Sequence, residues 1–506
     1  MHAGAEFLKN LVTFDFFDLN QRVEEMSPTL RRASKMISGL ILRKVARFEK
    51  GHTKVMKQID RLQALGLFDS RVPRYTSYPT APVFTAAVGA ADQARELQAL
   101  DPDVPVSVYL HIPFCERLCW FCACRTQGTQ TLSPVESYIG TLEQELKQVA
   151  PLLPKGLRMG RMHWGGGTPT ILPPALIHRL AQAVKAVFPQ TDNWEFSVEI
   201  DPTMVDREKI AALAAEGMNR ASIGIQDFDP LVQQAIGREQ PFEVTRACVE
   251  DLRAAGITSL NADLVYGLPH QTQARMADTV EKVLSLAPDR LALFGYAHVP
   301  WVAKRQKLIK EETLPDDLAR FHLAGLSAEK FAEAGFTAIG IDHFAKPGDG
   351  LEVAARTGHL RRNFQGYTDD TCPTLIGFGA SSISRFAGGY IQNAAATPAY
   401  VQRVEAGHLT GARGHVMSDE DLLRGRAIEM LMCEFRLNRV ELKQHFGHLA
   451  AMLDADLAQI AARFGDLVQL DDAALKILPE GRPLTRIIAS CFDAHVPEGV
   501  RYSRAS

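Results

Sequence analysis

The sequence predicts an α/β fold, an incomplete (β/α)6 TIM-like barrel followed by a smaller, mostly helical C-terminal domain. Two observations carry this prediction. Short β-branched runs alternate with amphipathic helical segments, and glycine or polar residues recur where the runs end. The predicted strands are 106–111, 159–164, 195–200, 220–225, 258–264 and 291–296. The helices between them are predicted at 133–150, 173–188, 206–216, 242–255 and 274–286.

Changes in pattern divide the chain into four predicted regions. The stretch between Arg31 and Lys57 is rich in Arg and Lys, so a helix on a membrane is the alternative to an unpacked extension. After the barrel strands, residues 343–389 have an irregular, glycine-rich pattern. The regions are a poorly ordered N-terminal extension (1–55), a substrate-side segment (56–105), the barrel domain (106–415) and the C-terminal domain (416–506).

The C-terminal domain has the pattern of a small winged-helix fold. Ser418 begins a helix, and Asp421 three residues later completes a capping box. A strand pair is expected within 467–478. Winged-helix folds often bind DNA, but this segment has no dense basic face, so a structural or substrate-covering role is favoured.

The composition is that of a large globular protein. The formal net charge of −3 gives no bulk attraction to nucleic acid. The 506 residues, 46% of them hydrophobic, are more chain than one average domain needs. No stretch approaches the roughly 20 apolar residues that span a bilayer. The N-terminus is acidic where a secretory signal would be basic. We therefore expect a cytoplasmic protein that binds neither nucleic acid nor a membrane.

Four of the eight cysteines lie between Cys115 and Cys124 in one loop after the first predicted strand. Cys115, Cys119 and Cys122 are separated by three and two residues, so three thiolates could hold three irons of a cubane cluster. The fourth iron would stay open to a ligand, unlike in electron-transfer clusters, which usually have four cysteine ligands. Cys124 could be a fourth ligand. Since its side chain tends to diverge from that of Cys122 in an extended loop, a place beside the site is favoured.

Other chemistries are possible at this loop. A structural zinc site usually takes four ligands from two pairs, and the sequence has no second pair. A redox-active dithiol and buried structural cysteines are the remaining alternatives. One tight cluster in a large chain is not typical of a disulfide framework, and thiolate-bound iron needs a reducing compartment, which also favours the cytoplasm.

Chemically distinctive segments follow every predicted strand. In barrel enzymes the active site lies at the carboxyl ends of the strands, so these segments are expected to meet there. After the cysteine loop they are Gly165-Gly166-Gly167-Thr168-Pro169, Glu199 with Asp201, Gln226 with Asp227, Asp263 to Pro269, and Ala297 with His298.

Several motifs resemble the oxygen-independent coproporphyrinogen III oxidase (dehydrogenase) family of the radical S-adenosylmethionine (SAM) superfamily. The three-cysteine spacing, with an aromatic residue before the third cysteine, is typical of the superfamily. The resemblance runs from about residue 58 to the C-terminus. Its motifs are VPRYTSYPT (72–80), YLHIPFC (109–115), HWGGGTP (163–169), GIQDF (224–228), GREQ (237–240), DLVYGLP (263–269) and RNFQGY (362–367).

The resemblance implies a radical SAM barrel, an oxidoreductase activity and a set of cofactors. A [4Fe–4S] cluster on Cys115, Cys119 and Cys122 would bind SAM at its open iron and release a 5′-deoxyadenosyl radical. The radical would start the decarboxylation of two propionates of coproporphyrinogen III, giving protoporphyrinogen IX in haem (porphyrin) biosynthesis. Two SAM molecules, an electron donor protein such as a flavodoxin or ferredoxin, and a monomeric state are also implied.

The resemblance also implies which residues bind the cofactor. Glycine at 166 and 167 would let the backbone approach SAM closely, and the guanidinium of Arg238 suits a carboxylate. Arg74 and Arg362 are candidates for the substrate propionates on position alone, and no residue is assigned as catalytic. The first SAM would contact Tyr109, Gly166 and Glu199, and the second Phe121, Gly167, Thr168, Gln226, Arg238, Asp263, Ala297 and Ile383.

Three functions remain as alternatives. A haem chaperone of the same superfamily typically lacks a cysteine at the position of Cys124 and lacks the segment from Arg74 to Thr80, and this sequence has both. A non-catalytic iron–sulfur electron-transfer protein would need four protein ligands. A DNA-binding regulator that senses oxygen through the cluster would use the C-terminal domain.

Overall fold

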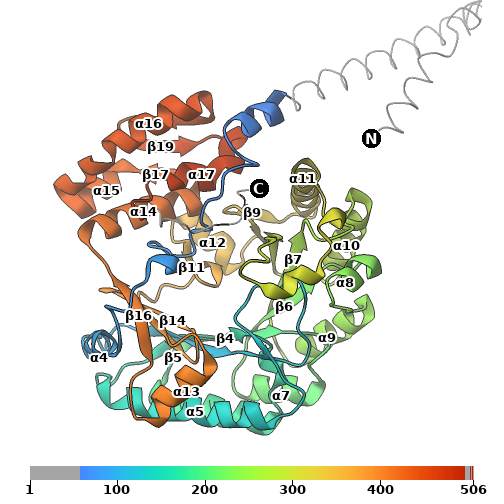
Figure 1. Cartoon of the computed structure of the whole chain (residues 1–506), viewed down its shortest axis with the longest axis vertical. Coiled ribbons are helices and arrows are strands. Elements are labelled where there is room, and N and C mark those ends of the chain that lie inside the picture. The colour runs from blue at the N-terminus through green and yellow to red at the C-terminus, as the bar shows by residue number, and fades with distance from the viewer. Residues whose placement is uncertain (1–56, 496–501, 503, 505–506) are drawn as a thin grey trace, which may run out of the picture. The chain divides into compact units, whose positions relative to one another are not determined.

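The computed structural model describes residues 57–495, 502 and 504 (Figure 1). The predicted extension at residues 1–55 therefore lies outside the described residues. The chain divides into two compact units, Met1–Leu65 and Gly66–Ser506. In the first unit residues 57–64 are helical. All that follows concerns the second unit.

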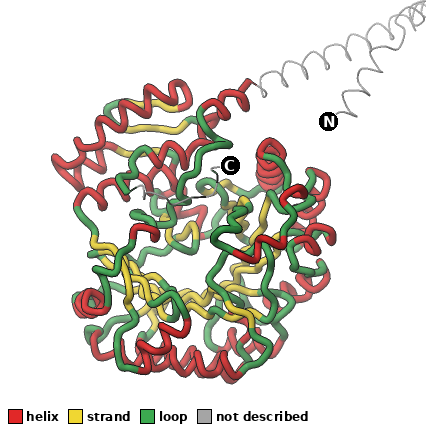
Figure 2. The backbone as a smooth tube through the Cα atoms, viewed as in Figure 1, coloured by secondary structure: helices red, strands yellow, loops and turns green. Residues whose placement is uncertain are grey.

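The six predicted strands form the parallel centre of a 12-stranded sheet. They lie side by side in chain order with parallel pairing throughout. Figures 1 and 2 show them curving as an open barrel wall with helices outside, which confirms the predicted incomplete (β/α)6 barrel. The strands are β1 (Val106–Ile112), β4 (Met159–Gly166), β5 (Gln190–Ile200), β6 (Arg220–Gln226), β7 (Ser259–Tyr266) and β8 (Arg290–Gly295).

The helices between these strands also follow the predicted pattern, because each has an apolar stripe that packs on the sheet. In the helix after β1, for example, Val135, Ile139, Leu142 and Leu146 are buried at helical spacing. The short α8 (Pro230–Ala235) was not predicted. The other outer helices are α5 (Ser133–Val149), α6 (Pro174–Val187), α7 (Arg207–Ala215), α9 (Phe242–Ala254) and α10 (Gln273–Ser285).

Short strands extend the sheet at both edges. At one edge β13 (Leu375–Phe378) pairs parallel with β1, and β14 (Ile383–Phe386), β15 (Gly389–Asn393) and β16 (Gly411–Val416) continue antiparallel. At the other, β10 (His343–Ala345) and β9 (Thr337–Ile339) pair antiparallel after β8.

The irregular, glycine-rich stretch at 343–389 nevertheless contains regular elements. That stretch holds β10, β13 and β14 and a separate hairpin of β11 (Arg361–Asn363) and β12 (Gly366–Thr368). Strands of three or four residues are too short for an alternating pattern to show. The remaining helices of the barrel region are α4 (Ala90–Gln98), α11 (Asp317–Glu333), α12 (Gly350–Thr357) and α13 (Thr397–Glu405).

The C-terminal region packs helices against a small sheet. Ser418 caps α14 (Asp419–Glu434), and the capping box with Asp421 is present as predicted. The predicted strand pair is β18 (Val468–Leu470) with β19 (Ala474–Ile477), and β17 (Arg436–Asn438) completes a three-stranded antiparallel sheet. The other helices are α15 (Arg439–Phe446), α16 (Asp454–Phe464) and α17 (Thr485–Ser490). The four-domain division itself stays a prediction.

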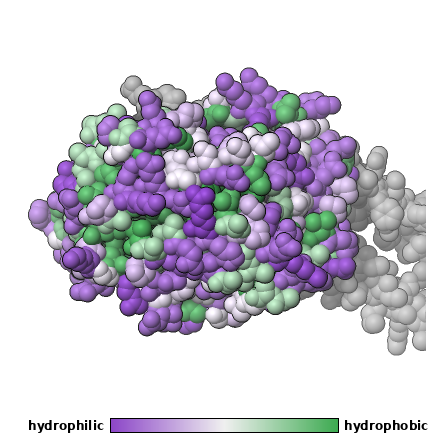
Figure 3. Space-filling model, turned by 90° about the horizontal axis from the view of Figure 1, so that it is seen from below, coloured by the Kyte–Doolittle hydropathy of each residue, from purple (hydrophilic) through white to green (hydrophobic). Residues whose placement is uncertain are grey.

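The surface view agrees with the buried core. Large side chains such as Trp164, Phe196 and Tyr400 are fully buried. Figure 3 shows one face on which hydrophilic side chains dominate and hydrophobic ones are scattered. Within the described part of the chain, no helix combines the length and the apolar character needed to cross a membrane.

Candidate active site

The cysteine loop is held at both ends and in the middle. Cys115 lies in β2 (Phe114–Cys115), which pairs with β3 (Gln127–Gly128) on the far side of the loop. The backbone N–H of Trp120 donates to the Ile236 carbonyl at 2.9 Å, just beyond α8. Backbone bonds thus fix the loop over the carboxyl ends of the barrel strands.

The loop and the strand ends enclose one cavity of about 220 Å³. The predicted convergence is therefore present for four strands, since β4, β5, β6 and β7 each contribute lining residues, but Ala297 and His298 after β8 do not line this cavity. The cavity is lined by Cys115, Arg117, Cys119, Phe121, Cys122, Cys124, Thr126, Gly166, Gly167, Thr168, Glu199, Ile200, Asp201, Ser222, Gly224, Gln226, Arg238, Asp263 and Arg305.

The cysteines of the loop differ in acidity. The thiol of Cys124 hydrogen-bonds to Cys122 and, against the effect of burial, lowers the pKa of Cys122 to about 6, helped by Arg305 and Arg238. Burial raises the pKa of Cys115 to about 11. Because thiolate is the form that binds metal, the cations beside Cys122 suit an iron–sulfur cluster.

Two further contacts stabilise sulfur in this cavity. The backbone N–H of Cys124 donates to Cys122 Sγ at 3.4 Å, and Arg238 Nη1 lies 3.7 Å from Cys119 Sγ. Such donors offset the negative charge that thiolates and sulfide bring to a cluster. The side chains of this cavity therefore suit an iron–sulfur cluster.

The glycine motif packs directly under the cysteine loop. Gly166 has φ +108°, and a Cβ there would lie 2.5 Å from the His111 ring. A Cβ at Gly167 would lie 2.5 Å from the Phe114 carbonyl oxygen. The Gly167 and Thr168 N–H groups donate to Ile112 and Phe114 at 2.8 Å. Glycine is thus required here by the close approach of the protein's own backbone and His111.

Glu199 presents a carboxylate to the cavity. Its Oε2 accepts from the Gly166 N–H at 3.1 Å, and its Oε1 lies 3.6 Å from His163 Nε2. The side chain remains 44% exposed. Partial burial opposes ionisation, but the contacts with His163 and Gly166 outweigh it and lower the pKa of Glu199. The site thus holds an anion with unused acceptor capacity.

Arg238 lies between the cysteine loop and the end of β6. Its Nη2 donates to the Gly224 carbonyl at 2.9 Å and lies 3.3 Å from Asp201 Oδ2. Gln226 ends the strand at φ +69°, a conformation that is rare for a residue other than glycine. The contacts of Arg238 with Gly224 and Asp201 fix a cation at the cavity wall.

Asp263 is held by its neighbours on β6 and β7. It accepts from Ser222 Oγ at 3.0 Å and Asn261 Nδ2 at 2.7 Å, and burial raises its pKa. The sequence pattern missed Ser222 and also Arg305, which donates to Thr126 Oγ1 at 2.8 Å. Arg305 stands in a run of Lys and Arg that reads as surface charge, so no sequence signal singles it out.

Three predicted cofactor residues are not among those lining this cavity. The Tyr109 ring stacks on His163 at 5.8 Å, behind Glu199. The Ala297 carbonyl accepts from Gln306 Nε2 at 3.1 Å, and the same Nε2 donates to the Phe121 carbonyl at 2.7 Å. Ile383 begins β14. Their contact with SAM stays a prediction.

The two predicted substrate arginines lie elsewhere. Arg74 Nη2 donates to the Gly295 carbonyl at 2.7 Å, at the end of β8. Arg362, whose side chain is 4% exposed, lies 4.3 Å over the Tyr367 ring with Nη1 3.8 Å from Asp342 Oδ1. Two cavities of about 470 and 330 Å³ share Arg362 in their lining.

Known proteins are similar to this chain over most of its length. Residues 109–283 match the Radical SAM superfamily. The chain is 64% identical over 452 residues to oxygen-independent coproporphyrinogen III oxidase of Cereibacter sphaeroides, covering 89% of this chain and 100% of that protein. It is 53% identical over 440 residues to the Paracoccus denitrificans protein of the same name, covering 87% and 98%.

A solved structure agrees with these relatives. Coproporphyrinogen III oxidase from Escherichia coli, described as a radical SAM enzyme, superposes with a TM-score of 0.80 at 37% identity, covering 84% of this chain and 100% of that one. The similarity thus spans the barrel and the C-terminal region. The chain belongs to the oxygen-independent coproporphyrinogen III oxidase family of the radical SAM superfamily.

Proposed function

We propose that this chain catalyses the oxygen-independent oxidative decarboxylation of coproporphyrinogen III to protoporphyrinogen IX in haem biosynthesis. The observation that carries the proposal is the cavity in which the cysteine loop meets the ends of β4 to β7, in a chain 64% identical to a curated oxidase. Membership of the radical SAM superfamily implies a [4Fe–4S] cluster and SAM. A bound cluster would supply the electron that breaks the sulfonium C–S bond of SAM into methionine and a 5′-deoxyadenosyl radical.

Within the cysteine loop, Cys115, Cys119 and Cys122 are the proposed ligands. Cys124 would remain beside the cluster, with its backbone N–H donating to Cys122 Sγ. Arg238 and Arg305 line the same cavity and would balance the charge of three thiolates. Phe121, which also lines it, would keep water from the reactive centre.

The finer proposal is that two SAM molecules bind. Glu199 has acceptor capacity for the amine of one SAM, with Gly166 beside it and Tyr109 behind. Arg238 would pair with the carboxylate of the second, near Gly167, Thr168, Gln226 and Asp263. Equilibrium dialysis of the cluster-loaded protein against labelled SAM tests this, with two per chain expected and one per chain against it.

The substrate's carboxylates need cationic partners, and arginine binds carboxylates bidentately. The two larger cavities adjoin, because Arg361, Arg362, Pro373, Arg385 and Tyr390 line both. Three of these five are arginines, which favours this region for propionates. Arg362 is the proposed propionate ligand. Arg74 would instead hold its own segment against the end of β8 through its bond to the Gly295 carbonyl.

The surface beside the cysteine loop suits an acidic electron carrier such as a flavodoxin or ferredoxin. Lys304, Lys307 and Lys310 are exposed there, outnumbering the acids Glu311 and Glu312 that follow. Trp120 of the cysteine loop and Lys310 line one shallow cavity. A Lys307→Glu variant should be reduced more slowly by a protein donor but at an unchanged rate by dithionite.

One assay tests the activity. Cluster-loaded protein is incubated without oxygen with SAM, a reductant and coproporphyrinogen III. Protoporphyrinogen IX and 5′-deoxyadenosine should both form, and the Cys119→Ala variant should form neither. Stable haem binding without conversion of coproporphyrinogen would instead support the haem chaperone.

A further inference from the structure

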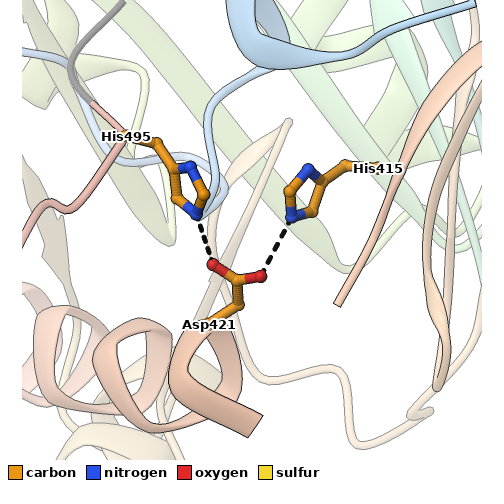
Figure 4. Close-up of side chains that lie close together, drawn as sticks. All are labelled: His415, Asp421 and His495. Atoms are coloured by element: carbon orange, nitrogen blue, oxygen red, sulfur yellow. Dashed lines mark hydrogen bonds and ion pairs between the residues drawn. The ribbon is translucent and has the colours of Figure 1, made fainter. Parts of the chain in front are cut away.

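A second group of ligand-type side chains lies outside the cysteine cavity. His415, Asp421 and His495 each offer one ligand atom, and these atoms lie within 4.8 Å of one another. Figure 4 shows both imidazoles directed at the carboxylate between them. They come from β16, from the first turn of α14 and from the segment after α17, so folding alone brings them together.

The geometry is that of two imidazoles on one carboxylate. His415 Nε2 lies 3.0 Å from Asp421 Oδ2, and His495 Nε2 lies 2.5 Å from Oδ1. The histidine ring centroids are 5.2 Å apart. Each Nε2 therefore points at a different oxygen of the same carboxylate. A divalent cation bound by both Nε2 atoms and the carboxylate would take the place of these two hydrogen bonds, with each neutral imidazole keeping its proton on Nδ1.

The carboxylate is oriented before any ion binds. Asp421 is buried, and its Oδ2 accepts from the Ser418 N–H at 2.9 Å and from Ser418 Oγ at 2.8 Å. Outer contacts of this kind fix metal ligands and raise affinity. The side chains of His415 and His495 are 18% and 32% exposed, so an ion can reach them from solvent.

We propose that His415, Asp421 and His495 bind a divalent transition-metal ion, for which Zn²⁺ is the probe. Two neutral imidazoles and one carboxylate are a ligand set that Zn²⁺ and its first-row neighbours prefer over Mg²⁺ or Ca²⁺. Three protein ligands leave one tetrahedral position for water. The site is separate from the cysteine loop, so its failure leaves the proposed function untouched.

The ion would join the barrel to the C-terminal region. The segment that carries His495 also holds the substrate-side segment, since Tyr78 Oη accepts from the Ala494 N–H at 3.0 Å and Tyr75 Oη donates to Asp493 at 3.0 Å. Tyr75 and Tyr78 line the larger of the two substrate cavities. Binding would therefore stiffen one wall of that cavity.

The test measures zinc on the cluster-loaded, full-length protein. Wild type, His415→Gln, His495→Gln and His448→Gln are equilibrated with Zn²⁺ without oxygen, desalted and analysed for zinc and iron. His448 is an exposed histidine of the same region and serves as the matched control. Asp421→Asn is avoided because it would also disturb the cap of α14.

The expected result is one zinc per chain in wild type and His448→Gln, with binding weakened about tenfold or more in each of the other two variants. X-ray absorption at the zinc edge should give N/O ligands at about 2.0–2.1 Å and no sulfur at about 2.3 Å. Zinc should raise the Tm of wild type and His448→Gln but not the Tm of His415→Gln or His495→Gln. No retained zinc, equal zinc in all four proteins, or sulfur ligation would overturn the proposal.

Discussion

Glu145 on α5 and Glu199 at the end of β5 are both carboxylates on the barrel, but they differ in how many hydrogen bonds they accept from the protein. Glu145 is 1% exposed and accepts from the Gly379 N–H, Asn393 Nδ2, Tyr400 Oη and Thr410 Oγ1 at 2.6–2.9 Å. Glu199 accepts one hydrogen bond, from the Gly166 N–H at 3.1 Å, and lies 3.6 Å from His163 Nε2, and its side chain is 44% exposed.

The difference separates a structural carboxylate from a binding one. Every acceptor position of Glu145 is used by the protein, and the bonds tie α5 to the short strands at the sheet edge. Glu199 keeps acceptor positions that a ligand can use. Burial raises the pKa of Glu145 despite its hydrogen bonds, whereas the pKa of Glu199 is lowered against the effect of burial by His163 and Gly166.

The largest expected effect is on stability, at Glu145. The Glu145→Ala variant leaves three buried donors without an acceptor, because Asn393 Nδ2 also donates to the Gly379 carbonyl and to Ser382 Oγ. At about 1–3 kcal/mol for each donor if unrelieved, we expect a loss of about 3 kcal/mol or more. Urea unfolding of the cluster-loaded protein measures it. A loss below about 1 kcal/mol would contradict a structural role.

The counterpart at Glu199 should affect binding instead. Glu199→Gln removes a charge that we propose bonds the SAM amine, worth about 1.5–3 kcal/mol, so the Kd for SAM should rise roughly 10- to 100-fold. The free energy of unfolding should change by less than about 1 kcal/mol. Titration of SAM against the cluster's electron paramagnetic resonance (EPR) signal gives the Kd, and unchanged affinity would contradict a binding role for Glu199.

Two buried arginines differ in the same way, one closely paired within the protein and one less so. The side chains of Arg290 and Arg362 are each 4% exposed. Arg290 has two close ion pairs, with Asp349 at 2.7 Å and Asp369 at 3.0 Å, and among the described residues only its Nη1 lacks a hydrogen bond. Arg362 has one looser ion pair, with Nη1 3.8 Å from Asp342, and both its Nε and its Nη1 make no hydrogen bond to the described residues. The Arg362→Lys variant should therefore raise KM for coproporphyrinogen about tenfold. Arg207→Lys, at an 85% exposed arginine, should leave KM unchanged.

The smallest expected effect is on the pH dependence of stability. Because the folded-state pKa of Glu145 is above its ordinary value of 4.5, the folded protein binds more protons in the interval between the two values. Stability from this group is therefore greatest below 4.5 and falls as pH rises through that interval. The Glu145→Gln variant should lose this slope, which is at most about 1.4 kcal/mol per pH unit. An identical pH profile in both proteins would contradict it.

How far the sequence predicts this molecule differs between the same two regions. The six parallel strands and Glu199 could be predicted, because each strand has its own apolar run and Glu199 stands at the end of one. The partners of Glu145 could not, since Gly379 and Thr410 are 234 and 265 residues away and lie on or beside very short strands.

Other parts of the site depended on resemblance alone. Tyr109 and Ile383 carry no sequence signal of their own, whereas Ala297 follows the sixth predicted strand. None of the three lines the cysteine cavity. Asp421 was predicted only as a helix cap. Its contact with His495, 74 residues away, arises from tertiary packing that no local pattern encodes.

The open iron of the proposed cluster is the point on which the account depends, and the Cys124→Ala variant tests it most directly. Iron analysis and EPR of the reduced protein, with and without SAM, are compared between wild type and variant. We predict four irons per cluster in both and a change of the EPR signal on adding SAM. Loss of iron from the variant, or a wild-type signal unchanged by SAM, would contradict the three-cysteine site.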